Sequence, residues 1–193
     1  MDPRLFAAFD PERGVIDGSP AVRRRLSDLP GIFADEEAYR ALVESGNPLL
    51  YTVSTFDMPS GEGALHCGLG VISPGRVGDE YFMTRGHLHA RRETAEFYIG
   101  LRGTGLMLLQ REDGSGEQTV DLLPQSLVYV PGGTAHRTVN TGSEPLAYLG
   151  VYPATAGHDY AAIGTFHSMV VARDGRPAVI PREAGNIQKR GKR

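Results

Sequence analysis

Three histidines and one glutamate fall in two short stretches of the chain, and their residue types are those of a metal site. The stretch "GHLHARRETAEF" places His87 and His89 two residues apart and Glu96 seven residues after His89, and His136 follows in "PGGTAHRTVN". Residues two apart on a strand point to the same face, so we expect the imidazoles of His87 and His89 to be neighbours. Three imidazoles and a carboxylate suit a divalent first-row metal such as iron, manganese, nickel or zinc.

A second glutamate, Glu93, competes with Glu96 for the carboxylate position. Glu93 follows His89 by four residues and belongs to the polar run "ARRET", which is typical of a solvated turn. Glu96 opens the apolar stretch "EFYIGL", where a strand would orient its side chain. We therefore expect Glu96 to be the ligand, brought back beside the histidines by a hairpin.

The frame that positions these side chains is predicted to be built of strands. From residue 51 onward, short runs rich in β-forming residues alternate with turn signals, and Asp-Gly pairs at 113–114 and 174–175 mark two hairpins. About ten short strands at this spacing are typical of an all-β barrel or jelly roll.

One segment departs from the strand pattern. The stretch "DEEAYRALVESG", residues 35–46, predicts a helix with Asp35 as its N-cap and Gly46 as its stop. We expect a single domain over residues 1–193. It has an N-terminal arm with one helix over 1–50, a barrel over 51–180 and a basic tail over 181–193.

Composition excludes several classes of partner. The chain has 193 residues and a net charge of −3, which gives no bulk attraction to nucleic acid or to a membrane surface. No apolar run approaches the roughly 20 residues that span a bilayer, and the first residues lack the pattern of a signal peptide. Cys67 is the only cysteine, so no disulfide can form within the chain, and a cytoplasmic location is expected.

The two histidine-bearing stretches resemble the two motifs of the cupin superfamily, whose double-stranded β-helix (jelly-roll) barrels hold one metal inside. The first stretch reads threonine, a basic residue, Gly-His-x-His, and then Glu-x-Tyr-x-x-x-x-Gly-x-Gly. Together with "VYPATAGHDY" at 151–160, it is similar to the cupin-type phosphoglucose isomerases first known from archaea. The similarity runs from about residue 51 to about residue 180.

The resemblance implies a metal-dependent aldose–ketose isomerase that interconverts glucose 6-phosphate and fructose 6-phosphate, in glycolysis and gluconeogenesis. It implies one divalent ion per subunit, with Fe²⁺ expected first and Zn²⁺, Mn²⁺ or Ni²⁺ as alternatives, and a homodimer. The catalytic candidates are Glu96, His158 and Tyr152, and whether Glu96 is base, ligand or both stays open. The implied metal ligands are His87, His89, Glu96 and His136, and the implied substrate contacts are Thr84, Gly86, Tyr98, Tyr152, His158 and Tyr160.

The chain departs from the family pattern at two places. The position six residues before Pro131, usually glycine in the second cupin motif, is Gln125. Relatives often carry an aromatic pair before Ala-His, whereas Gly133 and Thr134 stand here. If such a pair lines the sugar pocket, the pocket of this chain is wider or is closed differently. Arg85 has two interpretations, a cation for the phosphate or an outward-facing strand residue.

Two other functions stay open beside the isomerase. Three histidines and a glutamate also hold iron in oxygen-dependent cupin dioxygenases, although the "GHDY" stretch argues against that activity. A non-catalytic cupin that binds a sugar phosphate is the other alternative, and the altered segment at 133–134 is the feature that favours it.

Overall fold

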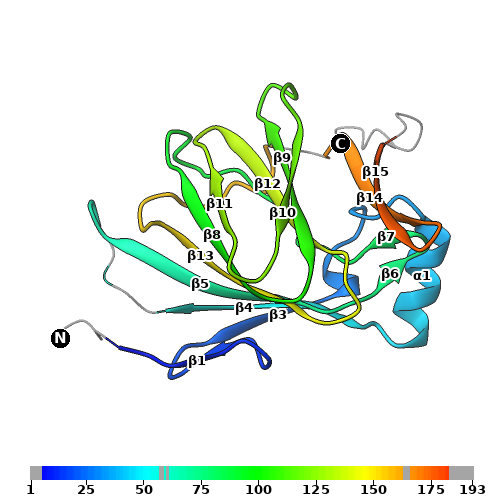
Figure 1. The fold of residues 1–193 in the computed structure, drawn as a ribbon, viewed down its shortest axis with the longest axis horizontal. Helices are drawn as coiled ribbons and strands as arrows, with labels where there is room; N and C mark the ends of the chain where they lie inside the picture. Colours follow the sequence, from blue (N-terminus) through cyan, green and yellow to red (C-terminus); the bar gives the residue numbers. More distant parts are fainter. Residues whose placement is uncertain (1–5, 57–58, 60, 163–165, 183–193) are drawn as a thin grey trace, which may run out of the picture.

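A computed structural model of the protein describes residues 6–56, 59, 61–162 and 166–182, and Figure 1 shows its fold. One α-helix, α1 (Glu36–Ser45), and one short 3₁₀ helix, η1 (Leu26–Asp28), accompany the strands in the described part of the chain. The strands are β1 (Phe9–Asp10), β2 (Val15–Ile16), β3 (Ala21–Arg25), β4 (Leu49–Phe56), β5 (Leu65–Ile72), β6 (Arg76–Val77), β7 (Glu80–Tyr81), β8 (Glu96–Arg102), β9 (Gly105–Arg111), β10 (Gln118–Leu122), β11 (Leu127–Val130), β12 (Thr134–Asn140), β13 (Leu146–Pro153), β14 (Ser168–Arg173) and β15 (Arg176–Pro181).

Two antiparallel sheets enclose a common interior and form the predicted cupin barrel. One sheet has the strand order β11-β8-β13-β5-β4-β3, and the other has the order β10-β9-β12. Burial alternates along β8, where Glu96 and Tyr98 are buried and Phe97 is exposed, as expected of a strand with one face toward the interior. Fully buried Leu50, Ile72 and similar apolar side chains fill the core. Each contributes about 1.5–3 kcal/mol by leaving water.

The predicted helix is confirmed. The Asp35 side chain accepts a hydrogen bond from the Ala38 N–H at 2.9 Å, and α1 ends before Gly46. Tyr39 is buried on the inner face of the helix and donates its hydroxyl to the Leu26 carbonyl at 3.3 Å. Figure 1 shows α1 gathered with β6, β7, β14 and β15 at one end of the molecule.

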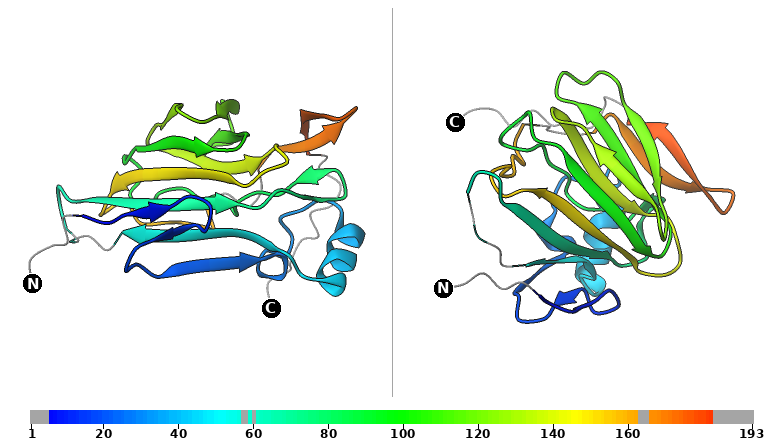
Figure 2. Two further views of the ribbon diagram at one scale, coloured as in Figure 1. Left: turned by 60° about the horizontal axis from the view of Figure 1, so that its bottom comes forward. Right: turned by 60° about the vertical axis from the view of Figure 1, so that its left-hand side comes forward.

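Part of the expected N-terminal arm belongs to the barrel sheet. β3 pairs antiparallel with β4, with Val22 opposite Val53, and so extends the six-stranded sheet. The β1–β2 hairpin lies outside that sheet (Figure 2), where the Ile16 N–H donates to Ser54 Oγ at 3.1 Å. Ile16 also packs with Leu69 and Val71 in a small apolar cluster. The arm therefore covers the outer face of the barrel.

The stretch "EYFMTR", residues 80–85, is one of the runs rich in β-forming residues, but it is a strand only at its start. β7 ends at Tyr81, and beyond it isolated bridges pair Met83 with Val139 and His87 with His136. The two Asp-Gly hairpins are confirmed as the β9–β10 and β14–β15 connections. None of the helices in the described ranges is long and apolar enough to cross a membrane.

Candidate metal centre

A β-bulge positions the first histidine. Met83 lies opposite Val139, and His87 lies opposite His136. His87 is four residues after Met83, whereas His136 is only three residues before Val139 on β12. One extra residue is therefore inserted between them, and Gly86 there has a φ of +77°, in the left-handed region that favours glycine. Because the bulge exchanges the two faces of the segment, His87 faces the same side as His136.

The four predicted ligands come together inside the barrel. The imidazole nitrogens of His87, His89 and His136 and the carboxylate oxygens of Glu96 supply one ligand atom each, and these atoms lie within 4.8 Å of one another. Glu96 Oε2 is 3.2 Å from His89 Nε2 and 3.1 Å from His136 Nε2. His89, Glu96 and His136 are buried.

Hydrogen bonds on the far side of two rings fix which nitrogen faces the cluster. His89 Nδ1 lies 3.0 Å from the Thr94 carbonyl, and His136 Nδ1 lies 3.1 Å from the Thr134 carbonyl. A carbonyl accepts only, so each Nδ1 carries a proton. Each Nε2 therefore faces the cluster, where it presents a lone pair when the ring is neutral and donates toward Glu96 when the ring is protonated. The Nε2 atoms of His87 and His136 are buried and have no hydrogen-bond partner among the described residues. Lone pairs directed at a carboxylate are the arrangement that a cation between them would stabilise.

The electrostatics of Glu96 and His87 favour the ionisation states that a metal requires, whereas the burial of His89 is outweighed by its hydrogen bonds to Glu96 and Thr94, which raise its pKa. Burial raises the pKa of Glu96, but the imidazoles of His136 and His89 outweigh it and lower the pKa to about 2. Burial and the imidazoles of its neighbours, His136 first among them, lower the pKa of His87. The carboxylate is therefore ionised and the His87 ring neutral at pH 7.

Aromatic rings cover the open side of the cluster. The His158 ring centroid is 4.5 Å from that of His87, and Tyr160 stacks on His158 with 10° between the ring planes. Tyr152 meets His158 edge-on at 5.5 Å. Burial, followed by the Glu96 carboxylate, raises the pKa of Tyr152 to about 12, so its hydroxyl is a proton donor at neutral pH.

The cluster opens into a cavity of about 110 Å³. Arg85 also lines it, with its guanidinium 5.5 Å from the centre of the Tyr160 ring, so it is exposed at the mouth rather than turned away. All six residues implied as substrate contacts line this cavity: Thr84, Gly86, Tyr98, Tyr152, His158 and Tyr160.

Two tyrosines of the cavity, Tyr51 and Tyr148, were not predicted. Tyr148 lies on β13 four residues before Tyr152, and residues an even number apart on a strand share a face, so the spacing was an available signal. Tyr51 comes from β4, and nothing in its local sequence distinguishes it from a core residue.

Glu93 is not part of the centre. Its side chain is exposed and accepts a hydrogen bond from Arg91 Nε at 2.7 Å, as expected of a solvated turn residue. Of the two carboxylates, it is Glu96 that faces the histidines.

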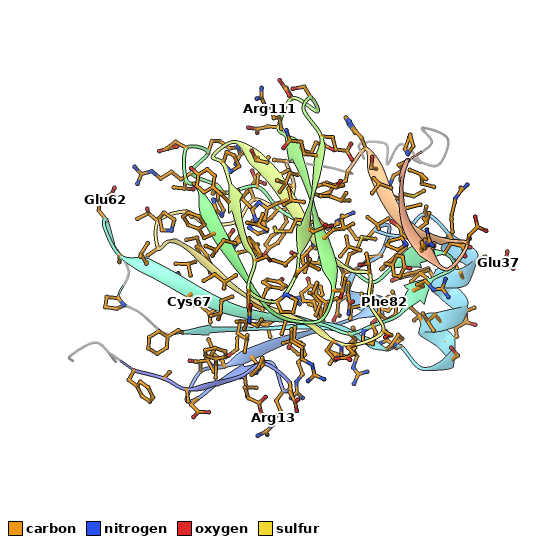
Figure 3. The ribbon with its side chains drawn as sticks, viewed as in Figure 1. Arg13, Glu37, Glu62, Cys67, Phe82 and Arg111 are labelled. Atoms are coloured by element: carbon orange, nitrogen blue, oxygen red, sulfur yellow. The ribbon has the colours of Figure 1, made fainter. Side chains whose placement is uncertain are left out.

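Gly133 and Thr134 do not line this cavity. They lie beside a separate hollow of about 510 Å³ with residues of the β9–β10 hairpin, whose tip is marked by Arg111 in Figure 3. The two residues that stand here are therefore not part of the wall of the pocket beside the four grouped side chains, which is made by other strands. Gln125, the other departure, has a φ of +67°, a conformation that glycine would adopt without strain.

Comparison with known proteins indicates the family of this chain. The model of the family described as "Glucose-6-phosphate isomerase (GPI)" matches residues 23–183. The chain is 46% identical over 178 residues to "Glucose-6-phosphate isomerase" of Pyrococcus horikoshii, covering 91% of this chain and 94% of that protein. It is 38% identical to "Putative glucose-6-phosphate isomerase 2" of Rhizobium meliloti, covering 86% of each.

Among solved structures, oxalate decarboxylase of Bacillus subtilis superposes with a TM-score of 0.44 at 21% identity. The superposition covers 56% of this chain and 26% of that one, so the chain spans about a quarter of that structure. The family match and the relatives cover most of the chain, and they carry the assignment. The chain belongs to the glucose-6-phosphate isomerase family.

Proposed function

We propose that the protein interconverts glucose 6-phosphate and fructose 6-phosphate, with one divalent metal bound by His87, His89, Glu96 and His136. The observation that supports this most directly is the shared cavity, because three of the four grouped residues, His87, Glu96 and His136, line the same space as Thr84, Gly86 and His158. A metal with free positions at such a site supplies Lewis-acid stabilisation of the negative charge that develops on O1 and O2 of the open-chain sugar.

The chain's own residues bind and orient the sugar. Tyr152 and His158 lie beside the cluster and line the cavity, where they can hold hydroxyl groups or move protons during ring opening. Burial lowers the pKa of His158, so its ring is neutral at pH 7 and can accept a proton. Thr84 and Gly86, with Arg85 at the mouth, form the end of the cavity that we assign to the phosphate.

Isomerisation also requires hydrogen to move between C1 and C2, and Glu96 is the candidate base. Its two oxygens have different neighbours: Oε2 lies between the imidazoles of His89 and His136, while Oε1 lies next to Gly150. We propose that Oε2 serves the metal and Oε1 remains available to the substrate, so that one residue has both roles.

The test is an anaerobic coupled assay on purified protein with elemental analysis of the same sample. Turnover should disappear on chelation and return with a divalent ion, and His136→Ala should reduce both the bound metal and the activity. A fully metal-loaded protein that isomerises no hexose or pentose phosphate would refute the proposal. We propose Fe²⁺ as the bound ion, and elemental analysis after anaerobic purification, with Zn²⁺, Mn²⁺ and Ni²⁺ measured alongside, tests that choice.

Nothing observed at the site favours the dioxygenase, and Gly133 and Thr134, which favoured a non-catalytic cupin, lie outside the cavity.

We place the enzyme in the cytoplasm, at the glucose 6-phosphate step of glycolysis and gluconeogenesis. The single Cys67 agrees with a reducing compartment, and activity measured after cell fractionation tests the location.

We also propose a homodimer. Phe97, Leu127 and Tyr129 expose 47%, 69% and 54% of their surface on the outer face of β8 and β11, and the rings of Phe97 and Tyr129 lie 5.2 Å apart. A contiguous apolar patch of this kind is typical of a protein interface. Sedimentation should give twice the monomer mass, and Leu127→Glu should shift the protein toward the monomer. A wild-type monomer at micromolar concentration would contradict the proposal.

A further inference from the structure

β12 carries a buried arginine directly after His136. Arg137 is 2% exposed, and because successive residues of a strand point to opposite faces, its side chain lies on the other side of β12 from the His136 ring. The guanidinium carbon lies 4.4 Å from the centre of the Phe166 ring. No carboxylate forms an ion pair with it among the described residues. The Glu80 carboxylate attracts the guanidinium without pairing with it, and buried donors that lack partners are costly, so the fold alone gives little reason for an arginine here.

Arg137 donates a hydrogen bond to a backbone carbonyl within the bulge. Its Nη2 donates to the Arg85 carbonyl at 2.7 Å, and Nε and Nη1 have no partner among the described residues. A bulge takes one residue out of the strand ladder and leaves its peptide groups without their usual partners. Arg137 therefore supplies the donor that the Arg85 carbonyl has lost.

The same peptide bond ends in the Gly86 N–H. The Arg85–Gly86 peptide is trans, and in a trans peptide the C=O and N–H point in opposite directions. The Arg85 carbonyl is directed at Arg137, so the Gly86 N–H is directed away from it, on the side where Gly86 lines the cavity. That N–H has no hydrogen-bond partner in the parts of the chain that the structure describes.

Two side chains also pack closely against Gly86. A Cβ added there would lie 2.7 Å from the Phe166 ring and 3.2 Å from Arg137 Cβ, so the glycine backbone sits directly on these two side chains. Arg137 and Phe166 form a buried support for the bulge, and the support carries a positive charge. A charged donor at the carbonyl end polarises the peptide and strengthens the N–H at the other end as a donor to an anion.

We propose that Arg137 is a positioning residue for the phosphate of the substrate. It fixes and polarises the Arg85–Gly86 peptide so that the Gly86 N–H is presented to a phosphate oxygen in the cavity. This inference rests on the proposed function for the identity of the substrate, but the support it assigns to the bulge applies to any phosphate at that end of the cavity.

The test measures phosphate binding and turnover separately. In Arg137→Met, which keeps the length of the side chain and removes its donors, the Kd of inorganic phosphate measured by calorimetry on metal-loaded protein should rise about tenfold. The KM for glucose 6-phosphate should rise by a similar factor, while kcat and the metal content change little. Arg137→Lys keeps the charge but loses the planar fork, and its Kd should rise several-fold, to a value between those of wild type and Arg137→Met.

A neighbouring arginine provides the matched control. Arg182 donates to Glu80 Oε1 at 2.7 Å and makes no contact with the 85–86 peptide, so Arg182→Met should lower the Tm and leave phosphate affinity unchanged.

An unchanged phosphate Kd in Arg137→Met would overturn the inference. So would a parallel loss of metal, kcat and phosphate binding, which would indicate a structural role only. If Arg137→Met does not fold, Arg137→Lys decides the matter, and a wild-type Kd in that variant would overturn the inference. If wild-type protein binds phosphate but isomerises nothing, the proposed function fails while the role of Arg137 is still measured.

Discussion

Gly150 leaves the room that the Glu96 carboxylate occupies, and replacing it with alanine should damage the metal site without damaging the fold. A Cβ at position 150 would lie 2.7 Å from Glu96 Oε1, about 0.7 Å short of the 3.4 Å at which ordinary contact begins. Gly150 lies in the regular strand β13 and is not among the residues with positive φ, so alanine brings no backbone strain. The carboxylate must therefore rotate or move.

The size of the effect follows from how tightly a metal specifies its ligands. Ligand distances are set to within about 0.2 Å, and disturbing the support of a ligand typically costs 10–100-fold in metal affinity, or about 1.4–2.8 kcal/mol. We expect a loss of this size in Gly150→Ala, measured by titration against a competing chelator. kcat/KM should fall with it at limiting metal.

Gly68 supplies a matched control for this substitution. It pairs with Gly150 across β5 and β13 and lines the same cavity, but a Cβ there would meet only Val53 and Thr55, at 3.9 Å and 4.0 Å. Gly68→Ala should bind metal as wild type does, and both variants should give wild-type circular dichroism. Equal metal affinity in the two variants would refute the reasoning that Glu96 is held against Gly150.

Three further substitutions test other parts of the structure. Gln125→Gly should stabilise the protein by about 0.5–1 kcal/mol, because the residue has a φ of +67°, and a Tm no higher than wild type would contradict this. Asp35→Ala removes the cap on the Ala38 N–H and should lower the free energy of unfolding by about 1 kcal/mol in urea titration, whereas Asp35→Asn should lose much less. Tyr152→Phe should lower kcat/KM about tenfold through one lost hydrogen bond. Burial raises the pKa of Tyr152 to about 12, so the hydroxyl stays protonated from pH 7 to pH 10 and the loss in kcat/KM should be constant over that range. A loss that shrinks as the pH rises would show that Tyr152 ionises there.

The elements that could be predicted from sequence are those whose signals are local. Asp35 and Gly46 bound the helix because capping depends on a few adjacent backbone groups. Gly114 and Gly175 have φ of +79° and +73°, as the Asp-Gly hairpin turns require. The grouping of the three histidines with Glu96 was also predictable, since His87 and His89 are two residues apart and Glu96 opens the strand that follows.

Features that depend on pairing between distant strands could not be predicted. The place of β3 at the edge of the barrel sheet depends on β4 leaving one side unpaired, which no local pattern records. Gly133 and Thr134 precede His136 by only a few residues, yet they line a different hollow, because the side of the barrel on which a loop opens is set by the neighbouring hairpin. Tyr51 lines the cavity because β4 pairs with β5, and no local pattern records that pairing.

The bulge shows why a regular-strand interpretation of "TRGHLH" is insufficient even though the histidines it groups do lie together. If the pairing of Met83 with Val139 continued without interruption, His87 would lie opposite Ala135, whose side chain faces away from that of His136. Thr84 and His87 are three residues apart and cannot share a face of a regular strand, yet both line the cavity. One inserted residue reconciles these facts, since it turns His87 inward and takes the Arg85–Gly86 peptide out of the ladder. The metal ligand and the free N–H that we assign to the phosphate therefore have the same structural origin, and any change that removes the bulge must affect both ends of the substrate together.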